Sequence, residues 1–196
     1  MPPFIYLASS SPRRRALLRQ IGVRYRLLRI AVDETPQVGE APAAYVTRLA
    51  MAKAQCGWRS LGRRIPAPVL GADTIVVCAG MMLGKPQHRE QGLAMLAQLS
   101  GNEHQVLSAV ALVSADFQAS KLQTSTVYFR DLSAEECSAY WESGEPQDKA
   151  GAYAIQGHAA SFISAIHGSY SGVMGLPLFE TAALLREQTL GKKNLT

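Results

Sequence analysis

The stretch LASSSPRRRALL, residues 7–18, joins an apolar run to an amphipathic one through serines and a proline. The apolar run from Phe4 to Ser9 is short and is ended at once by turn-forming residues, which is typical of a buried strand. The run from Pro12 to Gln20 has the pattern of a helix, because Ser11 can cap its first turn and proline suits its first position. The stretch therefore predicts a strand that leads directly into a capped helix.

Three consecutive arginines, Arg13, Arg14 and Arg15, occupy the first turn of this predicted helix. Unpaired backbone N–H groups and the positive end of the helix dipole disfavour a cation there by about 0.3–1 kcal/mol each. A bound polyanion would reverse the sign, because serine hydroxyls, backbone amides and guanidinium groups could all bind it. The alternative is three solvated arginines whose stems cover the surface. The stretch lacks the glycine patterns of a Walker A loop and of a dinucleotide site, so phosphate binding would use another design.

Length and composition predict one globular domain, with room for two lobes and a cleft between them. The chain has 196 residues, 47% of them hydrophobic, which is enough to bury a core. Its apolar runs fall short of the roughly 20 residues that cross a bilayer, and the N-terminal run is too short for a signal peptide. We therefore expect a soluble protein of the cytoplasm, with no membrane partner.

The cysteines and histidines form no recognisable site in the sequence. The three cysteines lie far apart in no metal-ligand spacing, which argues against a disulfide framework and a zinc site. The four histidines are scattered, and we assign them no chemistry. The formal charge of +5 indicates an anionic partner, and both a nucleotide and a nucleic acid fit that charge.

The remaining elements follow from hydrophobic period and from turn residues. Further strands are predicted at 25–32, 69–78, 81–84, 105–114, 120–130 and 161–166, further helices at 43–57, 88–99, 133–144 and 178–188, loops at 59–68 and 148–157, and a frayed tail from 191. Helices and strands mix without strict alternation, which favours an α/β or α+β fold around a mixed, twisted sheet.

Asp73 is a carboxylate within PVLGADTIVVCAG, residues 68–80, whose other members are mostly apolar. Aspartate is depleted in strands, and a buried carboxylate needs a partner, a metal ion or a function. The alternative is an aspartate that caps a strand end beside Gly71. Residues alone leave both interpretations open.

Two lysines are candidates for binding an anion. Lys53 lies on the same predicted helix face as Val46 and Leu49, which should face the core. It either extends to solvent or reaches through the edge of the core toward an anion. Lys85 follows the predicted hairpin within LGKP, where a lone lysine is commonly solvated.

Two further polar residues lie in predicted turns or loops. Glu34, within VDET, follows a predicted strand, where a ligand site or a simple acidic turn could lie. Gln156 lies in a loop in which Gly151 and Gly157 permit close backbone approach. Its amide can donate and accept, which suits a nucleobase edge, although a surface glutamine in a turn fits equally well.

Taken together, these motifs resemble the Maf family of nucleoside triphosphate pyrophosphatases. The matching segments are LASSSPRRRALL (7–18), VDET (32–35), RLAMAKA (48–54), VLGADTIV (69–76), LGKP (83–86), LSGNEH (99–104), EPQDKAGAYAIQG (145–157) and GSYSGVMGLPLFET (168–181). They occur in family order and cover the chain almost from end to end. The resemblance implies an α/β fold with an elongated sheet and a central cleft between two lobes.

The resemblance also implies an activity and residue roles. The activity is hydrolysis of a nucleoside triphosphate between the α and β phosphates, with a divalent cation, Mg²⁺ or Mn²⁺. Asp73 would be the general base, and Glu34 would join it at the metal or the water. The positions around the phosphates are Ser9, Arg13, Arg14, Lys53 and Lys85.

Substrate choice follows from the same resemblance. Arg13, Thr74 and Gln156 match the branch that acts on dTTP and UTP, whereas the 7-methyl-GTP branch tends to read GSDQ and AGSFKSEG at the corresponding segments. The residues after Gln156, at 158–161, depart from the glycines of many relatives. This departure concerns the shape of the binding-site wall near Gln156 rather than the chemistry of the site.

The alternatives are a 7-methyl-GTP-type pyrophosphatase and a non-catalytic nucleotide- or nucleic-acid-binding regulator of septum formation. Nucleic acid is disfavoured, because aromatic residues do not alternate with the basic ones: the cluster of Arg59, Arg63 and Arg64 has only Trp58 beside it. A homodimer is expected from the family resemblance alone.

Overall fold

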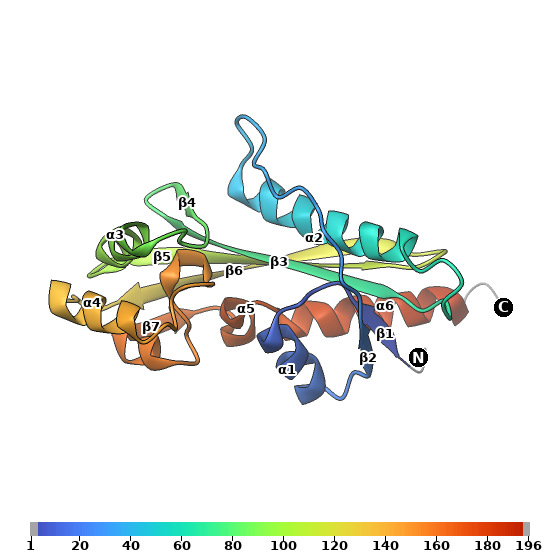
Figure 1. Cartoon of the computed structure of the whole chain (residues 1–196). Coiled ribbons are helices and arrows are strands. Elements are labelled where there is room, and N and C mark those ends of the chain that lie inside the picture. Colours follow the sequence, from blue (N-terminus) through green and yellow to red (C-terminus); the bar gives the residue numbers. More distant parts are fainter. Residues whose placement is uncertain (1–3, 194–196) are drawn as a thin grey trace. The chain divides into compact units, whose positions relative to one another are not determined.

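A computed structural model describes residues 4–193 of the chain. Its helices and strands are shown along the chain in Figure 1. In order they are β1 (Ile5–Leu7), α1 (Pro12–Gln20), β2 (Tyr25–Leu27), α2 (Pro42–Arg59), β3 (Val69–Cys78), β4 (Met81–Leu83), α3 (Arg89–Leu99), β5 (Glu103–Val113), β6 (Gln118–Phe129), α4 (Ala134–Glu142), the 3₁₀ turns η1 (Ala150–Ala152) and η2 (His158–Phe162), β7 (Ile163–His167), α5 (Tyr170–Met174) and α6 (Leu178–Lys193).

The strands described within residues 4–193 form one mixed sheet in the order β2-β1-β3-β5-β6-β7, and β4 pairs with β3. Strand β1 pairs in parallel with β2, Ile5 opposite Tyr25, and with β3, Tyr6 opposite Val69. The β3–β4 and β6–β7 pairs are antiparallel. The expected α/β fold with a mixed sheet is therefore confirmed.

The chain divides into two compact units. The first unit comprises Met1–Asp73, Ser108–Gln123 and Gly175–Thr196, and the second comprises Thr74–Leu107 and Thr124–Met174. The first unit holds sixteen of the 20 Lys and Arg residues of the chain and only seven of the 15 Asp and Glu residues. Positive charge is therefore concentrated in the first unit. The cleft expected between two lobes stays a prediction.

In the first unit, α2 packs closely against β3 because glycines stand at the contact. A Cβ at Gly71 would collide with the backbone oxygen of Ala50 and the backbone nitrogen of Ala54, both on α2. A Cβ at Gly57 would lie 2.7 Å from Val69 Cγ1. The absence of these side chains lets the helix backbone approach the strand. A small core adjoins this contact and comprises Tyr6, Ala8, Leu28, Leu61, Ala67 and Val69.

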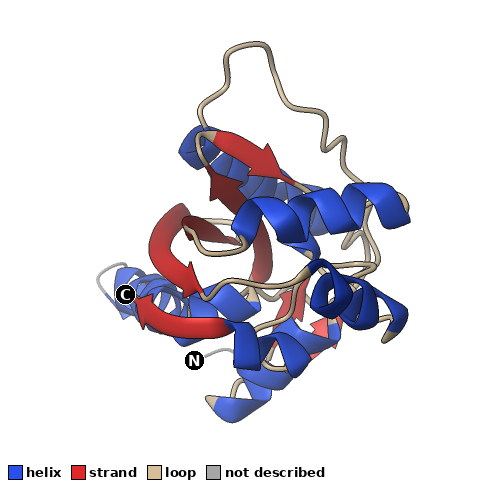
Figure 2. Ribbon diagram, turned by 90° about the vertical axis from the view of Figure 1, so that its left-hand side faces the viewer, coloured by secondary structure: helices blue, strands red, loops and turns tan. Residues whose placement is uncertain are grey.

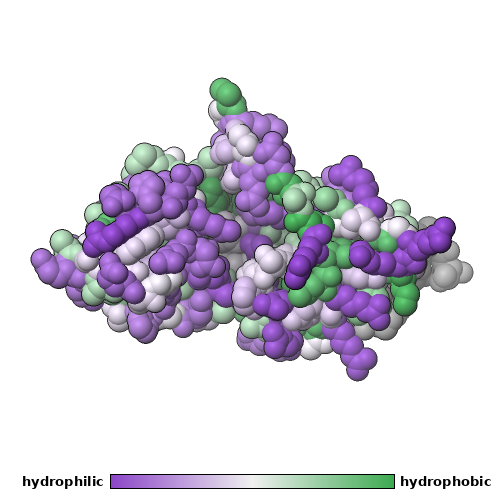
Figure 3. All heavy atoms as spheres, in the orientation of Figure 1, coloured by the Kyte–Doolittle hydropathy of each residue, from purple (hydrophilic) through white to green (hydrophobic). Residues whose placement is uncertain are grey.

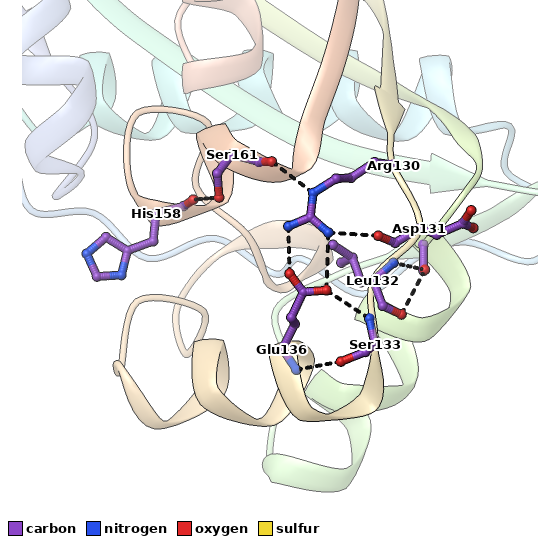
Figure 4. A network of polar contacts seen from close by, with 8 residues as sticks. Arg130, Asp131, Leu132, Ser133, Glu136, His158 and Ser161 are labelled. Carbon is purple, nitrogen blue, oxygen red and sulfur yellow. Dashed lines mark hydrogen bonds and ion pairs between the residues drawn. The ribbon is translucent and has the colours of Figure 1, made fainter.

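In the second unit, turns and caps appear where the sequence predicts them. Ala79 and Gly80 have φ angles of 48° and 75°, as a two-residue hairpin turn requires, and they join β3 to β4. Figure 4 shows the capping box at the start of α4, in which the Ser133 hydroxyl accepts from the Glu136 N–H and the Glu136 carboxylate accepts from the Ser133 N–H. The expected hairpin is confirmed, and the helix expected at 133–144 begins with a capping box.

The segment between β2 and α2, residues 28–41, is a long loop, drawn tan at the top of Figure 2. Strand β2 ends at Leu27, so the expected strand at 25–32 is too long. The physical reason is its partner, because β1 ends at Leu7 and offers nothing further to pair with. Val38 in this loop is fully exposed. The tip of the loop is green, the colour of hydrophobic residues, in Figure 3.

Two further features of the structure differ from the sequence-based expectations. Helix α5, Tyr170–Met174, was missed, because one short turn of helix leaves no periodic pattern. Helix α6 continues to Lys193, so the tail expected to be frayed from 191 is helical through 193, and residues 194–196 lie outside the described residues. Across the residues that the structure describes, no helix combines the length and the apolar character needed to cross a membrane.

Candidate active site

The serines before α1 organise the start of that helix. The Ser11 hydroxyl accepts from the Arg14 backbone N–H at 3.5 Å, and Pro12 occupies the first turn, as expected. The Ser9 hydroxyl accepts from the Ser11 backbone N–H at 3.2 Å. No acidic residue lies in the first turn of α1. The amino end of the helix is therefore capped and remains positive.

The Arg14 side chain turns back over this helix end. Its Nη1 donates to Ser9 Oγ at 3.2 Å, and its Nε donates to the Gly175 carbonyl oxygen at 2.7 Å. Both oxygens are neutral, so these bonds fix the guanidinium without cancelling its charge. Arg14 is thus held by the structure rather than spread on the surface. Arg13 is half-buried beside it.

Lys53 lies between two carboxylates. Its Nζ is 2.6 Å from Asp73 Oδ1 and 2.6 Å from Glu34 Oε1. The side chains of Lys53 and Asp73 are each 12% exposed, whereas that of Glu34 is 54% exposed. Lys53 therefore does not extend to solvent, and the anions it reaches are carboxylates of the chain itself. Asp73 is buried and paired rather than a cap at a strand end, because β3 continues to Cys78.

The close approach of α2 to β3 explains this pairing. Gly71 lies two residues before Asp73, and Ala50 and Ala54, which contact Gly71, flank Lys53 on α2. Successive side chains in a strand point to opposite faces, so Gly71 and Asp73 share a face. The glycine that admits the helix backbone thus stands beside the carboxylate that the helix lysine contacts.

Glu34 belongs to the loop 28–41, which α2 anchors. Tyr45 donates its hydroxyl to the Glu34 carbonyl oxygen at 2.8 Å. Arg48 binds both carboxylate oxygens of Glu40, at 2.6 and 2.7 Å, and donates to the Thr35 carbonyl oxygen at 3.2 Å. A loop without regular structure is therefore fixed at Glu34 and at the residues that follow it.

Tyr45 and Arg48 were missed by sequence reasoning. Their spacing of three residues puts them on one face of α2, which is a usable signal. Their partners lie in an irregular loop, however, and no periodicity points to such partners.

The charges of the site influence one another. Burial lowers the pKa of the Arg14 guanidinium, and the negative charge of Asp73 and, more weakly, Glu34 opposes that effect. Arginine nevertheless stays protonated in proteins. Burial raises the pKa of the Tyr45 hydroxyl, and the charges of Asp73 and Glu34 raise it further. Arg14, Glu34, Tyr45 and Asp73 therefore belong to one electrostatic cluster, into which Lys53 is bonded.

The other predicted site residues belong to the second unit. Lys85 and Gln156 are exposed, and Thr74 is half-buried. The Gly151 backbone N–H donates to the Gly84 carbonyl oxygen at 3.0 Å, so the loop that carries Lys85 lies against the loop that leads to Gln156. The structure thus brings together Ser9, Arg14, Glu34, Lys53 and Asp73 in the first unit, and the loops of Lys85 and Gln156 in the second.

Glu34 and Asp73 are the donors that suit a metal ion at this cluster. Mg²⁺ is commonly bound through one or two carboxylates, with substrate phosphates and water completing its shell. Two carboxylates that share one ammonium group fit that description, since both already face a cation. Within residues 4–193, no group of three or more His, Cys, Asp or Glu residues could hold a metal ion. A metal ion at this site stays a prediction.

The chain is similar to known proteins along most of its length. Residues 4–188 match the model of a family described as "Maf-like protein". The "dTTP/UTP pyrophosphatase" of Alkalilimnicola ehrlichii is 55% identical, over 94% of this chain and 93% of its own. The "dTTP/UTP pyrophosphatase" of Nitrosomonas europaea is 54% identical, over 93% of each chain. The solved structure of the Staphylococcus aureus Ham1 protein superposes with a TM-score of 0.41 at 15% identity, over 66% of this chain and 72% of its own.

Proposed function

The chain belongs to the Maf family, and on this premise we propose that it hydrolyses dTTP and UTP to the monophosphate and pyrophosphate. The family match confirms the resemblance read from the motifs. Curated relatives at 53–55% identity are named for this activity, which supports a hydrolase that acts on pyrimidine triphosphates. The observation in the structure that carries the proposal is the buried Asp73, joined through Lys53 to Glu34 in the same cluster as Arg14.

The positive groups of the first unit suit a triphosphate. Its negative charges repel an attacking hydroxide, so the reaction needs cations on the phosphate oxygens. We assign this task to Arg13, Arg14 and Lys53, with the Ser9 hydroxyl as a further donor. Lys85 is proposed to bind the phosphates as well. The capped amino end of α1 adds backbone N–H groups that favour an anion.

Asp73 is proposed as the general base. Its Oδ1 is bonded to Lys53, and a carboxylate has a second oxygen that can accept a proton from water. A carboxylate is a weak base for water, however. A bound Mg²⁺ or Mn²⁺ would lower the pKa of that water and neutralise phosphate charge. Glu34 and Asp73 would hold the ion, as the donor types at the cluster allow.

Gln156 and Thr74 are proposed to read the base, together with Arg13. A pyrimidine such as thymine or uracil presents an O4 acceptor beside an N3–H donor. A glutamine amide has the complementary donor and acceptor. Cytosine reverses both groups, so an amide held in one orientation should bind it poorly.

Substrate, location and assembly complete the proposal. The nucleotide substrate is a small molecule, and we place the protein in the cytoplasm, where nucleoside triphosphates are made and used. A homodimer stays a family expectation that sedimentation can test. A separate role in septum formation would have to coexist with hydrolysis.

A substrate screen tests the proposal. Pyrophosphate release, detected as phosphate after added inorganic pyrophosphatase, is measured with dTTP, UTP, CTP, GTP and 7-methyl-GTP in the presence of Mg²⁺ or Mn²⁺. We expect dTTP and UTP to give the highest kcat/KM. Preference for 7-methyl-GTP would assign the chain to the other branch, and no release from any triphosphate would indicate a binding protein.

A further inference from the structure

The exposed Gln156 lies in a tight turn of the second unit. The Gly157 backbone N–H donates to the Ala154 carbonyl oxygen at 3.0 Å, which closes a four-residue turn with Gln156 at its third position. Ala154 and Ile155 before it are buried, whereas the Gln156 side chain is exposed. The direction of the Gln156 amide is therefore set by whatever holds the two ends of this turn.

Two side chains from α4 and the residues after it hold both ends. Before the turn, the Ala154 backbone N–H donates to the Tyr140 hydroxyl at 3.1 Å. After the turn, the His158 backbone N–H donates to Glu145 Oε2 at 3.0 Å, and the Ala159 backbone N–H donates to Glu145 Oε1 at 3.5 Å. Tyr140 donates its own hydroxyl proton to Glu145 Oε1 at 2.7 Å. One tyrosine–glutamate pair thus joins the two ends of the Gln156 turn.

Gly157 makes this close arrangement possible. A Cβ at that position would collide with both carboxylate oxygens of Glu145. The φ angle of Gly157 is −112°, which other residues also adopt, so the need for glycine here is spatial. The carboxylate lies directly against the backbone of the residue that follows Gln156.

The pair is itself held in place. Tyr140 is 4% exposed, and its ring packs edge-to-face against Phe162 with centroids 5.1 Å apart. Burial raises the pKa of the Glu145 carboxyl, but the hydrogen bonds from Tyr140, His158 and Ala159 together bring it below its ordinary value, so the carboxylate is charged. An ionised acceptor makes the stronger kind of hydrogen bond.

Arg130 holds the next segment of chain, η2. Figure 4 shows Arg130 donating from Nε to the Ser161 carbonyl oxygen at 3.2 Å, while its other nitrogens bind the Glu136 carboxylate. The Ser161 hydroxyl donates to the His158 carbonyl oxygen at 2.9 Å. These contacts hold the chain before and after Gln156, whereas the side chain of Gln156 itself is exposed.

We propose that Glu145 and Tyr140 are positioning residues for Gln156, and that they set the selectivity of the enzyme for the pyrimidine base. This inference rests on the proposed function, since it needs Gln156 to read the base. It predicts that loosening the pair harms recognition of thymine more than it harms the reaction at the phosphates.

Substitution of Glu145 by Gln tests the inference with little change of shape. One of the two acceptor oxygens becomes an NH₂ group, which cannot accept from the His158 N–H or from the Tyr140 hydroxyl and Ala159 N–H, depending on its orientation. A backbone N–H or the Tyr140 hydroxyl then loses its acceptor, so the turn should loosen. Glu142→Gln is the matched control, because it removes the same charge from an exposed side chain that pairs with Arg89.

The measurement is the ratio of kcat/KM for dTTP to kcat/KM for dCTP, two substrates that share the sugar and the triphosphate. We expect Glu145→Gln to lower this ratio by roughly tenfold, mainly through the KM for dTTP, and Glu142→Gln to leave it unchanged. Amide exchange should also become faster at 154, 158 and 159 in Glu145→Gln. If Glu145→Gln does not fold, Tyr140→Phe keeps the ring and removes only the hydroxyl, and it should lower the same ratio.

The outcomes separate the two proposals. A ratio that stays at the wild-type value, even when both rates fall together, overturns the positioning role and leaves Glu145 as a residue of stability alone. Failure of the wild-type enzyme to release pyrophosphate from both dTTP and UTP overturns the proposed function instead. In that case the amide exchange still decides whether the pair holds the turn.

Discussion

Lys53 and Asp73 are joined by a contact of 2.6 Å between Nζ and Oδ1, although they lie 20 residues apart in the chain. The same ammonium contacts Glu34, so it shares its charge between two carboxylates. A buried carboxylate that loses the cation bonded to it is destabilised. We therefore regard Lys53 as both a structural partner of Asp73 and a candidate for binding phosphate.

Substitution of Lys53 by Met should show the structural half of this role. It keeps most of the length of the side chain and leaves Asp73 buried beside an apolar group. We expect a loss of roughly 1–3 kcal/mol in the free energy of unfolding, measured by urea denaturation. The double variant Lys53→Met with Asp73→Asn should recover part of that loss. Full stability of the single variant would show that the pair contributes nothing to the fold.

Substitution of Gly71 by Ala should disturb the contact between α2 and β3. The new Cβ would collide with the backbone of Ala50 and Ala54, so the helix must move away from the strand. Overpacking of this kind costs roughly 1–3 kcal/mol, seen as a lower thermal midpoint. Gly84→Ala is the stability control, since nothing lies within 4 Å of a Cβ there. Equal midpoints for the two variants would contradict the close packing.

Substitution of Arg48 by Ala should release the loop of Glu34. Arg48 binds Glu40 on both oxygens and holds the pKa of that carboxyl down at about 2. The Arg48 side chain is 30% exposed and that of Glu40 is 7% exposed, so the ion pair is partly buried, and we expect its loss to lower the unfolding free energy by about 1 kcal/mol. The kcat/KM for dTTP should nevertheless fall several-fold, because Glu34 loses its fixed position. Arg89→Ala, which breaks an exposed pair in the second unit, should leave kcat/KM intact.

His104 should make the second unit sensitive to acid. Its ring is buried, contacts the Tyr153 hydroxyl through Nε2 at 2.9 Å and leaves Nδ1 without a hydrogen-bond partner. Burial lowers the pKa of His104 from 6.5 to about 4. The unfolded chain then binds more protons than the folded one between these two values, so stability is present above pH 6.5 and is lost as the pH falls toward 4.

The free energy of unfolding should fall by roughly 3 kcal/mol once the titration of His104 is complete in both the folded and the unfolded chain. Urea unfolding at pH 7 and at pH 4.5 measures most of it. We expect His104→Phe to show a flatter dependence on pH than the wild-type protein, and the exposed His158→Gln to show the wild-type dependence. An unchanged slope in His104→Phe would assign the acid sensitivity to other groups.

Much of the fold can be predicted from local sequence because its signals are local. Ser11 and Pro12 define the start of α1, and the bounds Pro12–Gln20 and Val69–Cys78 agree with the structure. The strand expected at 25–32 is longer than β2, because the length of β2 depends on its pairing with β1, which is distant in sequence. Helix α5 was missed because it is a single turn.

The candidate site was found through residues that contradict their surroundings. Asp73 in an apolar strand and Lys53 on a core-facing stripe each broke a local rule, and the structure pairs them with each other. The pairing itself could not be predicted, because it depends on how closely Gly71 lets α2 approach. Tyr45 and Glu145 escaped notice for a related reason, since they act on backbone atoms of loops, which carry no pattern in the sequence.

The most direct test of the central claim is the rate of pyrophosphate release from dTTP by Asp73→Asn. The substitution keeps the size of the side chain but removes its ability to accept a proton. With folding verified by circular dichroism and urea unfolding, we expect kcat to fall by roughly a hundredfold or more at saturating divalent cation. A folded Asp73→Asn enzyme that retains most of the wild-type kcat would contradict the role of Asp73 as the general base.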